Sequence, residues 1–404
     1  MIAFTNYPGD TRVRREAEAL VARGNTVDVI CPWTPSLGDR RSMEGVRLHP
    51  TGGLEQKREL SPFAYIVRDV AFVLRAMFAA FRLHRRNRYA VVQVHTMPDY
   101  LVAAATFPKL MGAKVLLDVH DLVPELYAAK FGVDESSPVI KLMTFVERRC
   151  VAFADHALAV HRPHLDALVR HGSPEEKFTI VMNVPDPRLF TRRPAAPAES
   201  DPFVLLYHGT ISRRHGLETA MRAVGIAQRS YDDIRLEIVG DGDDVDRLST
   251  LVDELGLRGK IEIRRGLRPI EELKPIFERA SAGIVPIVDN AFTRYMLPVK
   301  LLEYVALGIP VISSTTPTIS AYFDETMVSY FRPGDEGDLA KRIVALRAHP
   351  ELRGRLVAQA DTFLERHSWD RERERYYDVV DSLVAAREPR ESQLTRKLGG
   401  RTLG

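Results

Sequence analysis

The sequence predicts an α/β protein built from two doubly wound, parallel-sheet domains in tandem. Short β-branched runs alternate with longer helical patterns, which is typical of strands joined by crossover helices. The alternation stops at a proline-rich stretch without periodicity, residues 186–202, and starts again after it, as expected of a linker. At 404 residues the chain also exceeds the roughly 100–200 residues of one ordinary domain.

The first domain is expected over residues 1–185. Ile2–Thr5 predicts an opening strand, Arg14–Arg23 a helix that Gly24 ends, and Val27–Cys31 the next strand, which together make one βαβ unit. The same patterns then predict four strands and two helices: Ala90–His95, Lys114–Val119, Ala157–Val160 and Thr179–Met182 as strands, with Tyr100–Leu110 and Val139–Ala152 as helices.

The second domain, over residues 203–368, repeats this architecture. Its predicted strands are Phe203–His208, Arg235–Val239, Ile261–Arg264, Gly283–Ile287 and Val311–Ser314, and its helices Gly216–Arg229, Asp244–Leu255, Glu271–Ala280, Asp338–Ala348 and Glu351–Glu365. A last helix over 369–386 is long enough to return to the first domain, and the polar tail 387–404 is predicted to be disordered.

Composition excludes several classes of protein. The net charge of +3 argues against a general nucleic-acid binder, and two distant cysteines give neither a disulfide framework nor a zinc site. The longest apolar run, Val70 to Phe81, contains Arg75 and is shorter than the roughly 20 residues that a membrane-spanning helix needs. No signal peptide is visible, and a cytoplasmic location is expected.

One short helix carries two charges among apolar residues. Pro298 suits its first turn and Gly308 the position just past its end, and the residues between them predict an almost wholly buried helix. Lys300 and Glu303 are three positions apart on one face, so one explanation is a mutual ion pair. The alternative is that Glu303 binds the hydroxyls of a ligand, since a buried carboxylate needs a partner.

Glycines and cations follow the predicted strands of the second domain. After Phe203–His208 come Gly209, Arg213, Arg214, His215 and Gly216, and further on come Gly240 and the pair Leu267 and Arg268. Glycines allow close backbone approach, a helix start offers free N–H groups, and arginine pairs with phosphate oxygens. The loops therefore predict an anion site in a crevice between the domains, with a solvated basic loop as the alternative.

These segments in this order resemble the family 4 glycosyltransferases, which are retaining enzymes of the GT-B fold that use nucleotide-diphosphate sugars. The second domain matches through Gly209 to Gly216, Val239–Gly242 and the Pro298–Val311 helix and strand. In the first domain the loop and helix from Asn6 to Leu20 and the segment Asp118–Glu125 are similar to the family's pattern. The implied fold is GT-B, two Rossmann-like domains with an inter-domain cleft.

The resemblance implies a role for each matching residue. Glu303 would hold the donor's ribose, the helix start at Pro298 and Val299 would face the diphosphate, and His120 would sit near the transferred sugar. Arg214 or Arg213, with Lys300, would neutralise the departing diphosphate, and Gly9, Gly209 and Gly240 would let backbone approach the donor. The remaining assignments are Leu267 and Arg268 near the base, His215 at the phosphates, and Arg12 and His95 toward the acceptor.

Two departures from the family's pattern touch the donor site. Tyr295 stands where the family commonly has a second glutamate, eight positions before Glu303, and His215 stands where it commonly has lysine. A neutral histidine would be the weaker phosphate partner. The expected mechanism is metal-independent electrostatic stabilisation of the leaving group, and no cofactor or metal is expected.

The acceptor is expected to be a glycan or a lipid-linked molecule. Residues 62–88 predict a long aromatic and aliphatic helix ending in arginines, which suits an anionic membrane surface, although a core-packed helix with a solvated end fits too. The donor is expected to be a UDP- or GDP-sugar. Two rival functions stay open: a GT-B-like nucleotide-sugar epimerase, for which Asp121 and Glu125 are the available carboxylate pair, and a non-catalytic nucleotide-sugar-binding subunit.

Overall fold

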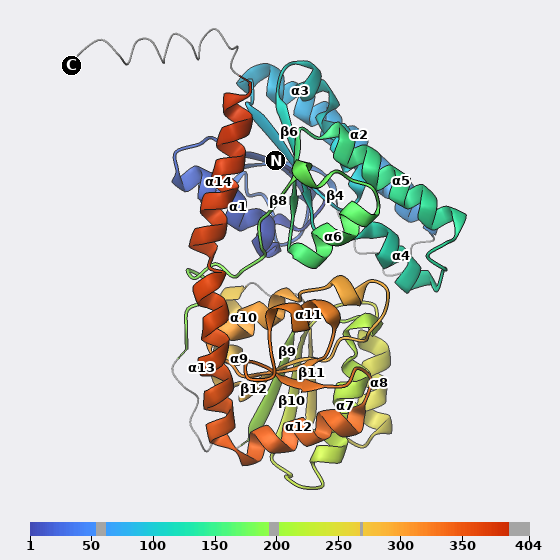
Figure 1. The fold of residues 1–404 in the computed structure, drawn as a ribbon, viewed down its shortest axis with the longest axis vertical. Coiled ribbons are helices and arrows are strands. Elements are labelled where there is room, and N and C mark those ends of the chain that lie inside the picture. The colour runs from blue at the N-terminus through green and yellow to red at the C-terminus, as the bar shows by residue number, and fades with distance from the viewer. Residues whose placement is uncertain (54–61, 194–201, 267–269, 388–404) are drawn as a thin grey trace, which may run out of the picture. The chain divides into compact units, whose positions relative to one another are not determined.

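The computed structural model describes residues 1–53, 62–193, 202–266 and 270–387 and confirms two parallel-sheet α/β units. The predicted base contacts Leu267 and Arg268 lie outside the described residues. Unit 1 comprises Met1–Met182 and the segment from Asp370 onward, and unit 2 comprises Asn183–Trp369 (Figure 1).

The sheet of unit 1 has eight strands in the order β3-β4-β2-β1-β5-β6-β7-β8, and only the β3–β4 pair is antiparallel. The strands are β1 Ile2–Ala3, β2 Asp28–Trp33, β3 Ser42–Met43, β4 Val46–Gly53, β5 Val91–His95, β6 Lys114–Val119, β7 His156–Ala159 and β8 Phe178–Ile180. Strands β3 and β4 were not predicted, because the proline and two glycines of β4 are weak strand formers. They lie at an edge, where such residues are tolerated.

Helices cover this sheet. They are α1 Thr11–Ala22, α2 Pro62–Asn87, α3 Thr106–Leu110, α4 Val123–Phe131, α5 Pro138–Phe153 and α6 Arg162–Arg170, with 3₁₀ turns η1 Tyr7–Gly9, η2 Asp99–Ala105 and η3 Glu175–Lys177. The helix predicted over Tyr100–Leu110 is η2 followed by α3, because Pro108 has no N–H to donate to the carbonyl four residues earlier. Helices α4 and α6 were not predicted.

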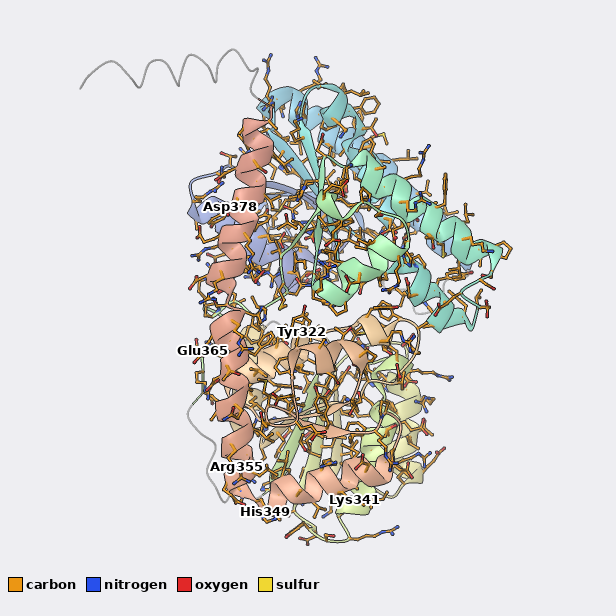
Figure 2. The ribbon with its side chains drawn as sticks, in the orientation of Figure 1. Tyr322, Lys341, His349, Arg355, Glu365 and Asp378 are labelled. Atoms are coloured by element: carbon orange, nitrogen blue, oxygen red, sulfur yellow. The ribbon has the colours of Figure 1, made fainter. Side chains whose placement is uncertain are left out.

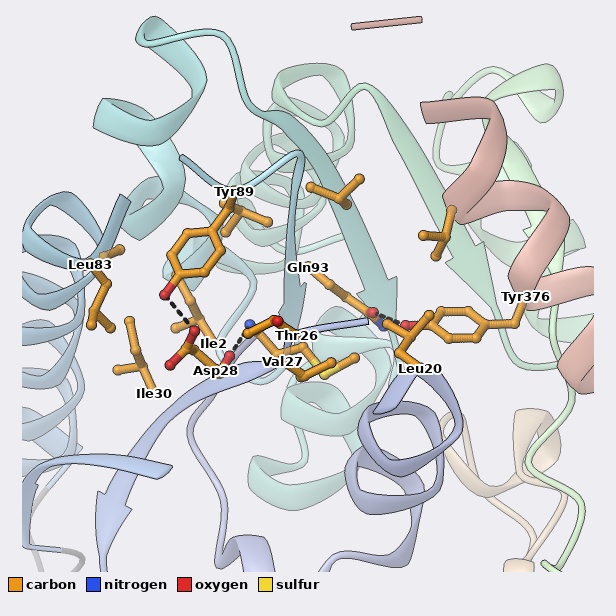
Figure 3. A pocket seen from close by; sticks show the side chains of 15 residues that line it. Ile2, Leu20, Thr26, Val27, Asp28, Ile30, Leu83, Tyr89, Gln93 and Tyr376 are labelled. Atoms are coloured by element: carbon orange, nitrogen blue, oxygen red, sulfur yellow. Dashed lines mark hydrogen bonds between the residues drawn. The ribbon is translucent and has the colours of Figure 1, made fainter. Parts of the chain in front are cut away.

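The last helix, α14 (Trp369–Ala385), packs on unit 1 although it follows unit 2 in the chain. Tyr376 is fully buried in the core of unit 1, and its hydroxyl donates to Oε1 of Gln93 on β5 at 2.6 Å (Figure 3). Gln93 in turn donates to Glu16 of α1 at 2.7 Å. A buried chain of hydrogen bonds therefore joins α14 to the first helix through the centre of the sheet.

The sheet of unit 2 has six parallel strands in the order β11-β10-β9-β12-β13-β14. They are β9 Phe203–His208, β10 Ile234–Gly240, β11 Ile261–Arg265, β12 Ala282–Val285, β13 Val311–Ser314 and β14 Ser329–Phe331. The helices are α7 Leu217–Ala227, α8 Val245–Glu254, α9 Ile270–Arg279, α10 Val299–Leu307, α11 Pro317–Tyr322, α12 Glu336–Ala348 and α13 Pro350–Arg366, with 3₁₀ turns η4 Arg213–His215 and η5 Thr293–Tyr295. Strand β14 and helix α11 were not predicted.

The strand order places the candidate site residues at the carboxyl ends of the strands. In unit 2, β9 is flanked by β10 and β12, so the loops after β9 and β10 meet at the carboxyl edge of the sheet. In unit 1, β5 pairs with β6, and the register sets His95 opposite Asp118. Among the described helices, none combines the length and apolar content needed to cross a bilayer.

Candidate active site

Helix α10 is buried between its two terminators, as the apolar sequence requires. Pro298 is its N-cap residue, and Gly308 ends it in the left-handed conformation with φ +70°. Leu301 and Leu302 are almost fully buried, and the charged Glu303 is only 8% exposed. A carboxylate so far removed from water requires hydrogen-bond partners.

The partner of Glu303 is His208, the last residue of β9. Nε2 of His208 lies 2.6 Å from Oε2 of Glu303, and Nδ1 lies 2.9 Å from the hydroxyl of Tyr304. Tyr304 donates its single proton to the carbonyl of Leu206 at 2.8 Å, so Nδ1 of His208 must be the donor in its contact with Tyr304. His208 is thereby fixed against Glu303, and Oε1 of the carboxylate remains for a ligand.

Lys300 has a different partner, so the alternative of a mutual Lys300–Glu303 ion pair is not what the structure contains. Its ammonium donates to the hydroxyl of Tyr207 at 2.8 Å and lies 4.1 Å from the centre of that ring. Burial lowers the pKa of Lys300 to about 7, with Arg214 acting in the same direction and Glu303 opposing it. An anion bound here would favour the charged ammonium again.

Glycines let the loops after β9, β10 and β12 pack backbone against backbone. Gly209 has φ +103°, and Gly216 has φ +64° with a carbonyl so near that a Cβ would lie 1.8 Å from the oxygen of Pro286. A Cβ at Gly240 would lie 1.8 Å from the oxygen of Gly209. Larger residues at these positions would push the loops apart, which explains the glycines without any ligand.

The cations of the β9–α7 loop differ in exposure. The side chain of Arg213 is 83% exposed and lies 3.9 Å from Asp244, whereas Arg214 is half-buried and its Nε has no hydrogen-bond partner among the described residues. Arg214 is therefore better placed than Arg213 to bind an anion. Burial, followed by the charges of Lys300 and Arg214, lowers the pKa of His215 to about 2, so this side chain is neutral.

Tyr295 is the last residue of η5, in the loop that leads from β12 to α10. The loop is held by Asn290, whose side chain accepts from the amides of Phe292 and Thr293 at 3.0 and 2.9 Å. Tyr295 brings no carboxylate to this segment. The chain thus lacks the negative charge that a glutamate at this position would supply.

Unit 1 contains a second cluster, at the carboxyl ends of β5 and β6. Nδ1 of His95 lies 3.0 Å from Oδ2 of Asp118 and 3.2 Å from Nε2 of His120, and all three residues are buried. Burial lowers the pKa of His120 to about 3, against the charge of Asp118. Burial would raise the pKa of Asp118, but His120 and His95 hold it below the ordinary range.

The outer ring nitrogens of this cluster, Nε2 of His95 and Nδ1 of His120, have no hydrogen-bond partner among the described residues. Buried polar atoms are normally satisfied, so these two nitrogens are candidates to bind the hydroxyls of a substrate. The three inner atoms lie within 4.8 Å of one another and form a set that could also hold a metal ion. The sequence expectation of no metal stays a prediction.

Gly9 ends η1, and Arg12 on α1 lies close enough to His120 and Asp118 for their charges to interact. Arg12 is held by Asp10, with Nε 3.0 Å from Oδ1 and Nη2 3.1 Å from Oδ2, so its guanidinium has a partner already. Asp10 also caps α1 by accepting from the amide of Arg12. A Cβ at Gly9 would lie 3.0 Å from the side-chain amide nitrogen of Asn6, so this side chain would have to move slightly.

Four partners of the site were not identified from the sequence. They are Tyr207, His208 and Tyr304 in unit 2 and Asp118 in unit 1. His208 and Asp118 each lie at or near the end of a predicted strand, which was the available signal. Their partners come from segments distant in the sequence, so the local sequence pattern does not identify them.

The chain matches two family models, one in each unit. Residues 9–183 match the glycosyl transferase 4-like domain, and residues 202–349 match the glycosyl transferases group 1 domain. Fold and matches together define a glycosyltransferase-family protein of the GT-B fold. The chain belongs to this family.

Curated relatives include glycosyltransferases of bacterial polysaccharide synthesis. The chain is 28% identical to the colanic acid biosynthesis glycosyltransferase WcaL of Escherichia coli K12, over 44% of each chain. It is 29% identical to the lipopolysaccharide core biosynthesis glycosyltransferase LpsD of Rhizobium meliloti, over 56% of this chain and 63% of the relative. The match thus spans about half the length of these relatives.

Solved structures share the fold over nearly the whole chain. Sucrose-phosphate synthase from Thermosynechococcus elongatus superposes with a TM-score of 0.75 at 21% identity, over 95% of this chain and 99% of that one. HepE of Anabaena in complex with UDP-glucose gives a TM-score of 0.71 at 14% identity, over 94% and 99%. At these identities the likeness concerns the fold.

Proposed function

We propose that this protein is a retaining glycosyltransferase that moves a hexose-type sugar from a UDP- or GDP-sugar to a glycan or lipid-linked acceptor, in the synthesis of a cell-surface polysaccharide or glycolipid. The observation that carries the proposal is the buried Glu303, fixed by His208 with one oxygen left over, beside Lys300 and Arg214. The UDP-glucose named in the HepE complex supports a nucleotide-sugar donor.

The side chains of unit 2 support donor binding there. Oε1 of Glu303 accepts from a ribose hydroxyl, as a charge-assisted hydrogen bond. The diphosphate lies against the free N–H groups at the start of α10, whose first residues are Val299 and Lys300. Arg214 and the ammonium of Lys300 supply the positive charge, which is why we propose that transfer requires no metal.

In the transfer step, the bond between the anomeric carbon of the sugar and the β-phosphate oxygen breaks, and a bond from that carbon to the acceptor oxygen forms on the same face. The proton of the acceptor hydroxyl passes to the departing diphosphate, so charge and atoms balance. Arg214 and Lys300 stabilise the negative charge that grows on the diphosphate. His120 binds a hydroxyl of the transferred sugar through Nδ1, and His95 and Arg12 belong to the acceptor side.

Features of unit 1 support the proposed acceptor and location. Helix α2 buries Phe72, Val73 and Ala76 but leaves Leu74 and Phe78 exposed by 59% and 61%. This pattern supports the proposal that residues 62–88 contact an anionic membrane from the cytoplasmic side, where a lipid-linked acceptor would be reached. The core-packed alternative accounts only for the buried face.

The rival epimerase is less well supported. It needs two carboxylates free to act as acid and base, and the available pair was Asp121 and Glu125. Oε1 of Glu125 lies 2.9 Å from Nε2 of His171, which also contacts Glu147 at 2.8 Å. Glu125 is thereby part of a charged cluster that joins α4, α5 and the end of α6.

The test is turnover of a panel of UDP- and GDP-sugars with native lipid extract as acceptor, for the wild-type chain and for Glu303→Ala. The matched control is Glu365→Ala, on the surface of α13 (Figure 2). We expect transfer by the wild type and the control, sharply reduced in Glu303→Ala. NMR of the product then reads the anomeric configuration. Wild-type turnover in Glu303→Ala would overturn the site assignment, and donor binding without transfer would favour the non-catalytic alternative.

A further inference from the structure

A cavity of about 650 Å³ lies on unit 1 between strand β4 and the second half of α2, outside the candidate active site. Five arginines line it, and we call it the arginine pocket: Arg41, Arg47, Arg75, Arg82 and Arg86. Its other lining residues include His49 and the apolar Leu48, Phe78 and Leu83. No aspartate or glutamate is among the lining residues that the structure describes.

Most of these guanidinium groups have no counter-charge within the described residues. Arg47 is paired with Asp28, but across the described ranges no carboxylate lies within ion-pair distance of Arg41, Arg75, Arg82 or Arg86. Four like charges around one cavity repel one another when no anion is bound. A bound anion relieves this repulsion, so the arginine pocket favours anion binding. Arginine with its planar fork is suited to phosphate oxygens.

Two of the arginines are positioned by their surroundings. Gly52 has φ +74°, and a Cβ there would lie 2.4 Å from Nη1 of Arg75, so the missing side chain is what lets this guanidinium lie over the end of β4. The guanidinium of Arg82 lies 5.8 Å from the ring centre of Phe78. The cations are thus held at the wall of the cavity.

An apolar stripe on α2 adjoins the pocket. Val67, Val70, Leu74 and Phe78 follow helical spacing and are exposed by 51%, 42%, 59% and 61%. Phe78 belongs both to this stripe and to the pocket wall. Helix α3, which packs on α2, adds Phe107 at 43% exposure and is followed by the exposed Met111. Unpaired arginines beside an exposed apolar row suit a ligand with a phosphate head and an apolar tail.

We propose that the arginine pocket binds the phosphate of an anionic membrane phospholipid, while Leu74 and Phe78 enter the edge of the acyl region. The phosphate is bound by Arg75, Arg82 and Arg86 from α2 and by Arg41 from the turn before β3. The lipid site would form part of the membrane contact in the proposed function. The proposal rests on that function only for its biological role, because lipid binding is measured without sugar transfer.

The experiment is flotation of the full chain with phosphatidylcholine vesicles, alone or mixed with phosphatidylglycerol. The test variant is Arg75→Ser/Arg82→Ser/Arg86→Ser. The matched control, Lys341→Ser/Arg355→Ser/Arg366→Ser on α12 and α13, removes the same charge from unit 2; Figure 2 labels two of these residues. At about 1 kcal/mol for each cation near an anionic surface, we expect roughly hundredfold weaker binding in the test variant and little change in the control.

Two further arms separate the alternatives. Leu74→Gln/Phe78→Gln should weaken binding to phosphatidylglycerol vesicles while keeping its salt dependence, because only the apolar contribution is lost. Inorganic phosphate should not displace the vesicles at millimolar concentration. Equal binding to both kinds of vesicle, equal loss in the control variant, or displacement by inorganic phosphate would overturn the proposal.

A failed proposed function would look different from a failed lipid site. If the lipid proposal alone is wrong, the wild type transfers sugar but does not float with anionic vesicles. If the glycosyl transfer alone is wrong, the chain floats but turns over no donor. Circular dichroism of each variant at the working temperature shows that it is folded.

Discussion

Nε2 of His208 lies 2.6 Å from Oε2 of Glu303, which joins the carboxyl end of β9 to the middle of the buried helix α10. The histidine is itself fixed by the hydroxyl of Tyr304, one residue further along the same helix. Glu303 therefore has one oxygen held in place and one available. Such a preorganised carboxylate can bind a vicinal diol without first losing side-chain freedom.

Replacing Glu303 by Gln should raise the KM for the nucleotide sugar roughly ten- to hundredfold, because charged hydrogen bonds are worth about 1.5–3 kcal/mol. Isothermal titration with UDP and GDP checks the same loss in binding. Glu365→Gln, on exposed α13, is the control and should bind as the wild type does. Unchanged nucleotide affinity in Glu303→Gln would exclude the ribose contact.

Nucleotide binding should take up a proton at Lys300. Burial lowers its pKa in the free protein to about 7, so the side chain is mostly the neutral amine above that pH. A bound diphosphate favours the charged form and raises this pKa. We expect close to one proton to be taken up at about pH 8.5 and almost none at about pH 6. Titration in buffers of different ionisation enthalpy measures it.

The control for this prediction is Lys300→Met, in which the proton uptake at alkaline pH should disappear. Binding should also become weaker at about pH 6, where the wild-type side chain is charged. Because His215 is neutral and near enough to Lys300 for its charge to lower the pKa of His215, His215→Asn is measured alongside. If proton uptake persists in Lys300→Met and is lost in His215→Asn, the histidine and not the lysine is the titrating group.

Gly240→Ala should destabilise unit 2 by about 1–3 kcal/mol or more, since its Cβ would overlap the carbonyl oxygen of Gly209. The loops after β9 and β10 must then separate, so nucleotide affinity should fall as well. Gly354→Ala on α13, where a Cβ would meet no atom within 4 Å, should instead stabilise by up to about 1 kcal/mol. Urea unfolding of both variants gives the comparison; equal stability would show that the loops adjust freely.

The strands at the centre of each sheet could be predicted from the sequence, as could the edge strands β8 and β11, whereas β3, β4 and β14 could not. Strands β6, β9 and β13 have the predicted bounds, because each is a run of apolar residues with clear terminators. The β3–β4 pair was missed, because an edge strand tolerates the proline and glycines that normally argue against a strand. Local pattern decides the first case and tertiary position the second.

The same division holds for the candidate site. Lys300 and Glu303 stood out because two charges in an apolar helix need an explanation, which a sequence shows. Their partners lie on β9, and His208 precedes Glu303 by 95 residues. Such pairing depends on how the strand and the helix pack. The sequence therefore suggested a Lys300–Glu303 pair that folding replaces with two separate contacts.

His171→Ala should destabilise unit 1 by about 3–5 kcal/mol, because it leaves Glu125 and Glu147 largely buried without their shared cation. Burial lowers the pKa of His171, but the two carboxylates raise it to about 10. The stabilisation is complete below the unfolded pKa of about 6.5 and is lost as the pH rises to about 10. Urea unfolding at several pH values measures this loss of stability with pH. It should be absent in His171→Ala and present in the exposed control His349→Ala.

His120→Asn should separate catalysis from nucleotide binding. The proposed role of His120 is a hydrogen bond to the transferred sugar, whereas Glu303, Lys300 and Arg214, the proposed nucleotide contacts, all belong to unit 2. Loss of one hydrogen bond in the transition state costs roughly 0.5–1.5 kcal/mol, so kcat should fall about two- to tenfold. The affinity for UDP or GDP alone should stay within about twofold of wild type, since no nucleotide contact is removed.

The control for general effects on unit 1 is His156→Ala. His156 is a half-buried histidine of β7 bonded to Thr179 at 2.9 Å, and its replacement should leave both kcat and the nucleotide affinity unchanged. A fall in nucleotide affinity equal to the fall in kcat/KM would show that His120 acts on the nucleotide or on the fold, and the sugar contact would have to be abandoned.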